Sequence, residues 1–71
     1  MRRPRQITEY RINKKSCESF RSRSPEDVRS WWTEHGCEGN PKYTVQYRYI
    51  RLDKYGMMEG SWSIWYDCKV P

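Results

Sequence analysis

A single amphipathic helix constrains this chain more than any other feature of its sequence. The pattern predicts a helix from Pro25 to His35, with Ser24 as the N-cap and Gly36 just past the C-terminus. Its apolar residues recur at helical spacing and form one stripe: Val28, Trp31, Trp32 and His35. Because a lone helix must bury such a stripe on another element, the rest of the chain is expected to supply a sheet.

Alternating polar and apolar residues predict strands on both sides of the helix. We expect strands at residues 6–13 and 18–23 around a turn at residues 14–16, which together form a hairpin. After a loop at residues 38–41, a third strand at residues 43–52 is expected to bulge near Tyr49 and Ile50, and a last strand covers residues 61–70. The fold class is therefore α+β: a small antiparallel sheet of four strands in the order β-β-α-β-β, with one helix packed on one face.

The core must be small, because the chain of 71 residues contains few aliphatic side chains. These are Ile7, Ile12, Val28, Val45, Ile50, Leu52, Ile64 and Val70. We expect one domain over residues 1–71, with a flexible basic arm at residues 1–5. The predicted core packs Val28, Trp31 and Trp32 against Tyr10, Ile12, Phe20, Val45, Tyr47, Ile64 and Tyr66.

Positive charge is concentrated in the first third of the chain. Residues 1–23 contain eight basic and two acidic groups (+6), whereas residues 24–71 contain six basic and seven acidic groups (−1). This asymmetry predicts a polyanion or an acidic protein surface as the partner. By strand alternation, the sheet face opposite the helix is open to solvent and collects Arg11, Arg21, Arg23, Arg48 and Trp65. The arm and the turn add Arg5, Lys14 and Lys15 to the candidate binding residues.

Arginines interleaved with a tryptophan support two interpretations. The guanidinium groups can bind phosphates while the indole ring stacks on a base, and the same surface can bind a protein. Alternatively, the ring only covers a cross-strand arginine through a cation–π contact. The sequence leaves both open.

The cysteine and histidine residues are candidate ligands for a zinc site. Cys17, His35, Cys37 and Cys68 are chemically able to form such a site, but they lack the closely spaced ligand pairs that structural zinc sites use, and reduced thiols are the preferred interpretation. The sequence likewise has no phosphate-binding glycine loop, and Cys37 just past a helix C-terminus is poorly placed to become a thiolate. We therefore expect no enzyme, no cofactor and no metal.

The first residues lack the apolar stretch of a signal peptide, and no segment approaches the roughly 18 apolar residues of a membrane span. We expect a cytoplasmic protein with no membrane partner.

The arrangement resembles that of small phage proteins that disable host machinery, in particular anti-CRISPR proteins. The similarity lies in the basic hairpin, the helix that opens with Ser24-Pro25-Glu26-Asp27, the second hairpin and the terminal Tyr66-Asp67-Cys68. It implies a non-enzymatic inhibitor in the host bacterial cell that binds a guide-RNA effector complex and blocks or misdirects its nucleic-acid binding. Small phage inhibitors of RNA polymerase share a similar topology.

A second similarity points to direct nucleic-acid binding. The segment from Ser24 to Trp32 resembles the capped, tryptophan-bearing helix of excisionases, although those folds place another helix before it, where residues 6–23 predict a hairpin. A small regulatory DNA- or RNA-binding protein is thus the alternative function. The small core also supports a third interpretation: a homodimer in which a second copy of the chain covers the open face.

Overall fold

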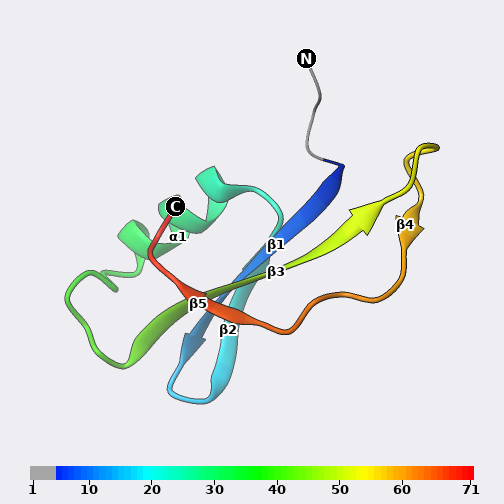
Figure 1. The fold of residues 1–71 in the computed structure, drawn as a ribbon. Coiled ribbons are helices and arrows are strands. Elements are labelled where there is room, and N and C mark those ends of the chain that lie inside the picture. Colours follow the sequence, from blue (N-terminus) through cyan, green and yellow to red (C-terminus); the bar gives the residue numbers. More distant parts are fainter. Residues whose placement is uncertain (1–4) are drawn as a thin grey trace.

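The computed structural model describes residues 5–71, which form one helix and five strands (Figure 1). The elements in chain order are β1 (Gln6–Lys14), β2 (Cys17–Ser22), α1 (Pro25–Glu34), β3 (Tyr43–Leu52), β4 (Met58–Glu59) and β5 (Tyr66–Cys68). The pairings are antiparallel, in the order β2-β1-β3-β4, and β5 pairs with another part of β3. The predicted α+β class is therefore confirmed. Of the arm expected at residues 1–5, residues 1–4 lie outside the described range.

The helix begins as the sequence predicts and ends one residue earlier. The Ser24 side chain accepts a hydrogen bond from the Asp27 backbone N–H at 3.4 Å and caps the helix. His35 is the C-cap, and its backbone N–H donates to the Trp31 carbonyl. The His35 ring stacks on the Trp31 ring at 3.8 Å but is exposed, so the apolar stripe ends outside the core.

Three aliphatic residues form the centre of the core: Ile12, Val28 and Val45. They are at most 3% exposed, and partly buried side chains surround them: Tyr10, Phe20, Trp31, Trp32, Tyr43, Cys68 and Val70. The helix lies over β1 and β2 and leaves the β5 side of this sheet face uncovered.

Three residues expected in the core lie outside it. Tyr47 and Tyr66 stack on each other at 5.4 Å beyond the reach of the helix, and Ile64 is 72% exposed. For Tyr47 and Tyr66 the prediction failed because it gave the single helix a wider sheet face than ten residues can cover, whereas Ile64 lies in a segment that does not form a regular strand.

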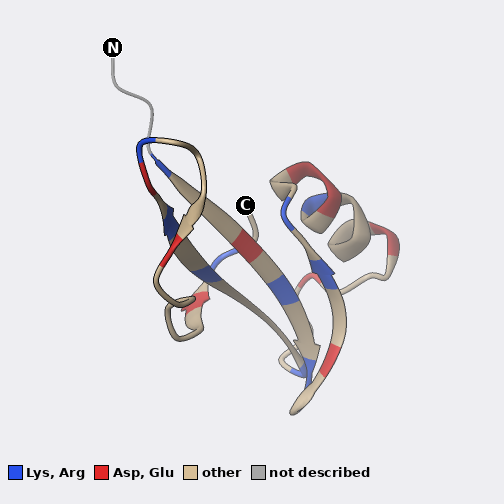
Figure 2. Ribbon diagram, turned by 90° about the vertical axis from the view of Figure 1, so that its right-hand side faces the viewer, with Lys and Arg blue, Asp and Glu red and all other residues tan. Residues whose placement is uncertain are grey.

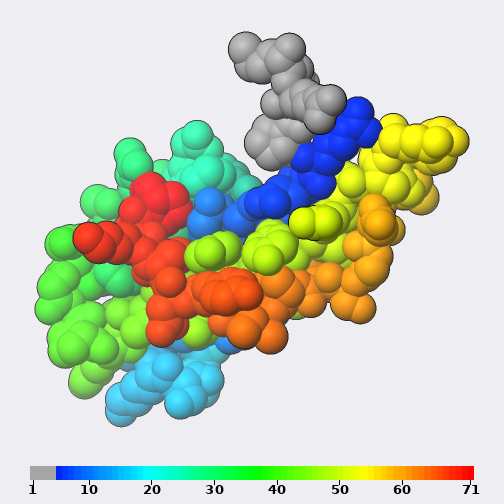
Figure 3. All heavy atoms as spheres, in the orientation of Figure 1, coloured from blue at the N-terminus to red at the C-terminus, as the bar shows by residue number. Residues whose placement is uncertain are grey.

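The predicted last strand is also wrong in its extent. Residues 60–65 separate β4 from β5 without forming a regular strand. In place of regular strand pairing, Ser63 connects this segment to β3. Its backbone N–H donates to the Tyr49 carbonyl at 2.8 Å, and its hydroxyl accepts from the Tyr49 N–H at 3.0 Å. Figure 3 shows this segment (orange) running from β4 to β5.

The bulge occurs in a different strand pair from the one predicted. The β1–β3 register runs from Gln6 opposite Arg51 to Lys14 opposite Tyr43 without a shift, so β3 does not bulge near Tyr49 and Ile50. The irregularity lies between β1 and β2, where Ser19 has no partner in β1. Ile50 is buried nonetheless, on the face opposite the helix.

Charge is segregated by layer. Residues 24–40, which include the helix, contain four acidic residues and one arginine, whereas the described residues 5–23 and 41–71 contain eleven basic and five acidic residues. Figure 2 shows the resulting distribution along the ribbon. Within the described chain, no helix is long and apolar enough to cross a membrane.

Candidate binding face

The strand register places the predicted arginines together on the sheet face opposite the helix. Arg11 lies opposite Arg21 in β2 and opposite Gln46 in β3, while Glu9 lies opposite Arg48. We call this surface the arginine–tryptophan face. It consists of Glu9, Arg11, Glu18, Arg21, Arg23, Gln46, Arg48, Trp62 and Trp65.

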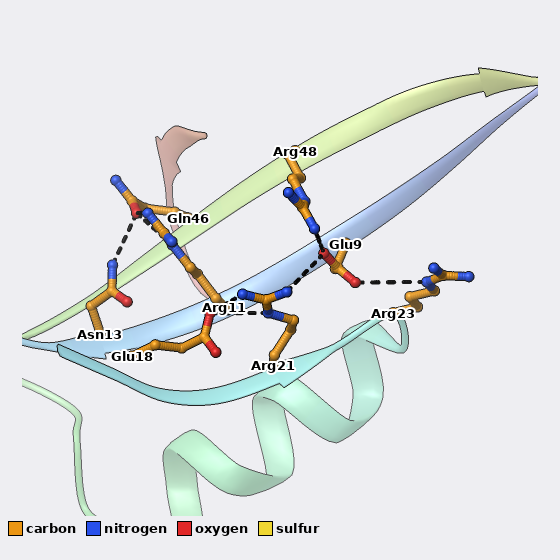
Figure 4. A network of polar contacts seen from close by, with 8 residues as sticks. All are labelled: Glu9, Arg11, Asn13, Glu18, Arg21, Arg23, Gln46 and Arg48. Atoms are coloured by element: carbon orange, nitrogen blue, oxygen red, sulfur yellow. Dashed lines mark hydrogen bonds and ion pairs between the residues drawn. The ribbon is translucent and has the colours of Figure 1, made fainter. Parts of the chain in front are cut away.

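The Glu9 carboxylate is the centre of this face, and three arginines converge on it (Figure 4). Arg48 makes the closest contact, with Nη2 at 2.6 Å and Nε at 2.8 Å from Oε1. Arg21 Nη1 is 3.8 Å from Oε1, and Arg23 Nε is 3.7 Å from Oε2. The Glu9 side chain is only 10% exposed, so its charge is held in a region with little solvent and depends on these partners.

A neutral side chain organises the neighbouring part of the face. Gln46 Oε1 accepts from Arg11 Nε at 2.9 Å, from Arg11 Nη2 at 2.7 Å and from Asn13 Nδ2 at 2.9 Å. The Gln46 amide then donates to Asp67 Oδ1 at 2.8 Å. Arg11 is thereby fixed in position while its charge has no direct carboxylate partner in this network.

Two tryptophans lie against the arginines. The Trp65 ring centroid is 4.1 Å from the Arg11 guanidinium carbon, 4.6 Å from that of Arg48 and 5.6 Å from that of Arg21. The Trp62 ring contacts Arg48 at 4.4 Å and Arg23 at 5.5 Å. These distances are within the range of cation–π attraction.

The expectation of a face open to solvent is therefore wrong in part, because residues 60–65 carry both rings onto it. Strand alternation missed Trp62, because this residue lies two positions before Ile64, which was expected in the core on the helix side. Alternation fails here because these residues do not follow the strand repeat, and Gly60, with a φ of 77°, marks the position where the repeat ends. Arg21 and Arg23 nevertheless keep 44% and 53% of their side-chain surface exposed.

The β-bulge brings a further charge to the face. Because Ser19 has no partner in β1, Glu18 turns to the same side as Arg21, and its Oε1 accepts from Arg21 Nε at 3.0 Å and Nη2 at 2.7 Å. This hydrogen bond is the main cause that raises the pKa of Arg21. Three of the four guanidinium groups on the face, those of Arg21, Arg23 and Arg48, thus have Glu9 or Glu18 as a direct carboxylate partner, whereas Arg11 bonds to the neutral Gln46.

The other three predicted binding residues lie apart from this face. Arg5 is exposed at the start of β1, where its carbonyl accepts from the Leu52 N–H. Lys14 and Lys15 lie at the other end of β1, and the Lys14 ammonium approaches the Tyr43 ring on the helix side at 5.7 Å. Lys14 and Arg11 are three residues apart in β1, so their side chains point to opposite faces of the sheet.

The three cysteines are free and differ in environment. Cys17 is exposed in β2, Cys37 is buried in the loop after α1, and Cys68 is partly buried in β5. Burial is the main cause that raises the pKa of both the Cys37 and the Cys68 thiol. Within the described range, no three His, Cys, Asp or Glu side chains are close enough to hold a metal ion.

A scan against models of known protein families finds no match for this chain, and searches of curated proteins and of solved structures find no similar one. What the face can bind therefore follows from its own residues.

Proposed function

We propose that this protein is a non-enzymatic inhibitor that binds a nucleoprotein complex through the arginine–tryptophan face. Bound there, it blocks or misdirects the nucleic-acid binding of its target, as small phage inhibitors of the anti-CRISPR type do. The observation that carries the proposal is the composition of this face, with four arginines, two tryptophans and two direct carboxylate partners fixed on a sheet.

Two properties favour a mixed target over bare nucleic acid. Tryptophan and arginine are the residues most enriched at the energetic centres of protein interfaces. The carboxylates Glu9 and Glu18 also neutralise part of the arginine charge, and this weakens attraction to a phosphate backbone while leaving a net positive surface. Because the side chains are already held by hydrogen bonds, binding requires little further ordering.

Direct DNA or RNA binding is the second candidate, and the ends of the sheet favour it. At one end the Lys15 N–H donates to the Lys42 carbonyl, which brings two exposed lysines together beside Lys14. At the other end, Arg5 directly precedes β1, and its carbonyl accepts from the N–H of Leu52, the residue after Arg51. These groups extend the positive surface beyond the arginine–tryptophan face.

Binding of labelled, non-specific double- and single-stranded DNA at about 50 and 200 mM salt separates the two candidates. Weak or absent binding at both concentrations is expected for the inhibitor and directs the search to a nucleoprotein target. Tight binding that falls by about tenfold or more at the higher concentration would overturn the inhibitor proposal in favour of direct nucleic-acid binding.

A further inference from the structure

The part of the sheet that the helix leaves uncovered is rich in tyrosine. Tyr10 of β1 lies opposite Tyr47 of β3, and Tyr47 lies opposite Tyr66 of β5. Tyr49 is two residues further along β3, so its side chain points to the same side of the sheet as that of Tyr47. All four tyrosines therefore lie on the helix side, where Tyr10 packs against the core.

A hollow of about 340 Å³ lies beside Tyr10 and Tyr47, and its volume is at the lower end of the range for ligand sites. The described residues that line it are Thr8, Tyr10, Tyr47, Cys68, Lys69 and Pro71. In Figure 3 the last residues of the chain (red) lie beside β1 (blue). Thr8 is two residues from Tyr10, and Cys68 is two residues from Tyr66, so the strand residues of this lining share the helix side of the sheet.

Tyr47 is both a wall of the hollow and the first ring of a stack. Its ring centroid is 5.4 Å from that of Tyr66, with the planes at 30°, and the Tyr66 centroid is 6.3 Å from that of Tyr49, with the planes at 7°. Neither Tyr49 nor Tyr66 is among the described residues that line the hollow. The stack therefore ends at the hollow, where a flat ring from a ligand can continue it.

The charges around the hollow favour an anionic ligand. Lys69 is exposed and is the one charged residue of the described lining. Arg29 Nε donates to the Pro71 carbonyl at 2.6 Å, which brings a second positive charge close to the wall that Pro71 forms. The hollow thus suits a ligand that joins a planar ring to a negatively charged group.

We propose that this hollow binds one unpaired nucleotide of a single-stranded nucleic acid. The base stacks on the Tyr47 ring, and the phosphate lies near Lys69 and Arg29, since bases stack on aromatic side chains and phosphates attract basic ones. The site is on the opposite side of the sheet from the arginine–tryptophan face, so it goes beyond the function proposed above and does not depend on it. A single stacked base is expected to bind with a dissociation constant of about 1 mM, which is compatible with weak binding of labelled DNA.

The test is a titration of the full chain with a short single strand of deoxyadenosines, followed by the NMR signals of the Tyr47 ring. The control is the same strand without its bases, which keeps the phosphates. The strand with bases is expected to shift the Tyr47 signals upfield, because a stacked base adds its ring current. The base-free strand is expected to bind about tenfold more weakly.

Matched variants locate the contact. Tyr47→Leu keeps an apolar side chain but removes the ring, and it is expected to weaken binding of the strand about fivefold. Tyr55→Leu removes an exposed ring outside the hollow and is expected to change the affinity less than about twofold. Lys69→Gln, at an exposed position where the fold tolerates the change, is expected to weaken binding about threefold, and Lys54→Gln is its control.

Four results would overturn the proposal. The first is an unchanged set of Tyr47 signals, and the second is equal binding of the base-free strand, which would mean that only phosphates are bound. The third is a shift with a proline-rich peptide but not with the strand, which would identify a protein segment as the occupant. The fourth is loss of binding in an Arg23→Gln variant but not in Tyr47→Leu, which would place the strand on the arginine–tryptophan face.

Discussion

The two faces of the sheet are held by different kinds of contact. On the helix side, Ile12, Val28 and Val45 form a dry centre surrounded by aromatic rings. On the other side, tryptophan rings pack against arginines whose charges converge on one nearly buried carboxylate. A chain with so few aliphatic residues fills one apolar layer under the helix. The second layer buries Ile50 but consists mainly of polar groups that bond to one another. The apolar layer supplies stability, while the polar layer combines stability with a charged surface.

The largest expected effect is on the apolar side. Ile12→Ala leaves a cavity at a fully buried position and is expected to lower the free energy of unfolding by about 3 kcal/mol, measured by urea denaturation. Ile64→Ala, at a side chain that is 72% exposed, is the matched control and is expected to cost less than about 0.5 kcal/mol. Similar losses for both variants would mean that the core does not lie under the helix.

The next largest effect is expected at the centre of the polar face. Glu9→Gln leaves Arg21, Arg23 and Arg48 facing a neutral amide, and the expected loss in the free energy of unfolding is about 2 kcal/mol. Glu18→Gln removes the same charge where the side chain is 36% exposed and is expected to cost less than about 1 kcal/mol. An equal cost for both would show that Glu9 is only one more surface ion pair.

A smaller effect is expected from the tryptophan contacts. Trp65→Leu keeps an apolar side chain but removes the ring that Arg11, Arg21 and Arg48 contact, and it is expected to lower the free energy of unfolding by about 1 kcal/mol. The control is Tyr55→Leu, which removes an exposed ring near Lys54. If urea denaturation finds no larger loss for Trp65→Leu than for this control, the rings only cover the face.

The smallest effect concerns the buried thiol. Burial raises the pKa of Cys37 above its ordinary value of 9.0, so the folded state favours the neutral thiol. The stability that this supplies is complete below the pKa of the unfolded chain and is lost as the pH rises through the folded value. Unfolding midpoints at about pH 7.5 and pH 10 are therefore expected to differ more for the wild type than for Cys37→Ala. An identical pH dependence in the two proteins would contradict this account.

Much of the fold could be predicted from the sequence because its signals are local. The cap at Ser24, the spacing of Val28 and Trp31, and the alternation in β1 and β3 each depend on neighbouring residues. Alternation also placed Arg11, Arg21, Arg23 and Arg48 on one face. The register puts Arg11, Arg21 and Arg48 there, and Arg23, just past β2, reaches the same face through its ion pair with Glu9.

What could not be predicted depends on contacts between distant segments. The bulge at Ser19, which turns Glu18 toward Arg21, is set by pairing with β1 and has no strong signal in the sequence. The position of Trp62 follows from the contact between Ser63 and Tyr49, fourteen residues apart. The exposure of Ile64 and the partial cover of the arginine–tryptophan face follow from the same departure from a regular strand.

If the arginine–tryptophan face is the binding surface, substitutions on it weaken the inhibition of a purified guide-RNA effector complex, measured as the DNA binding of that complex. Arg23→Gln and Arg29→Gln remove the same charge from exposed residues, the first on this face and the second on the helix. We predict that the wild type inhibits, that Arg23→Gln weakens inhibition about fivefold, and that Arg29→Gln changes it less than about twofold. No inhibition by the wild type, or equal losses in the two variants, would contradict the account.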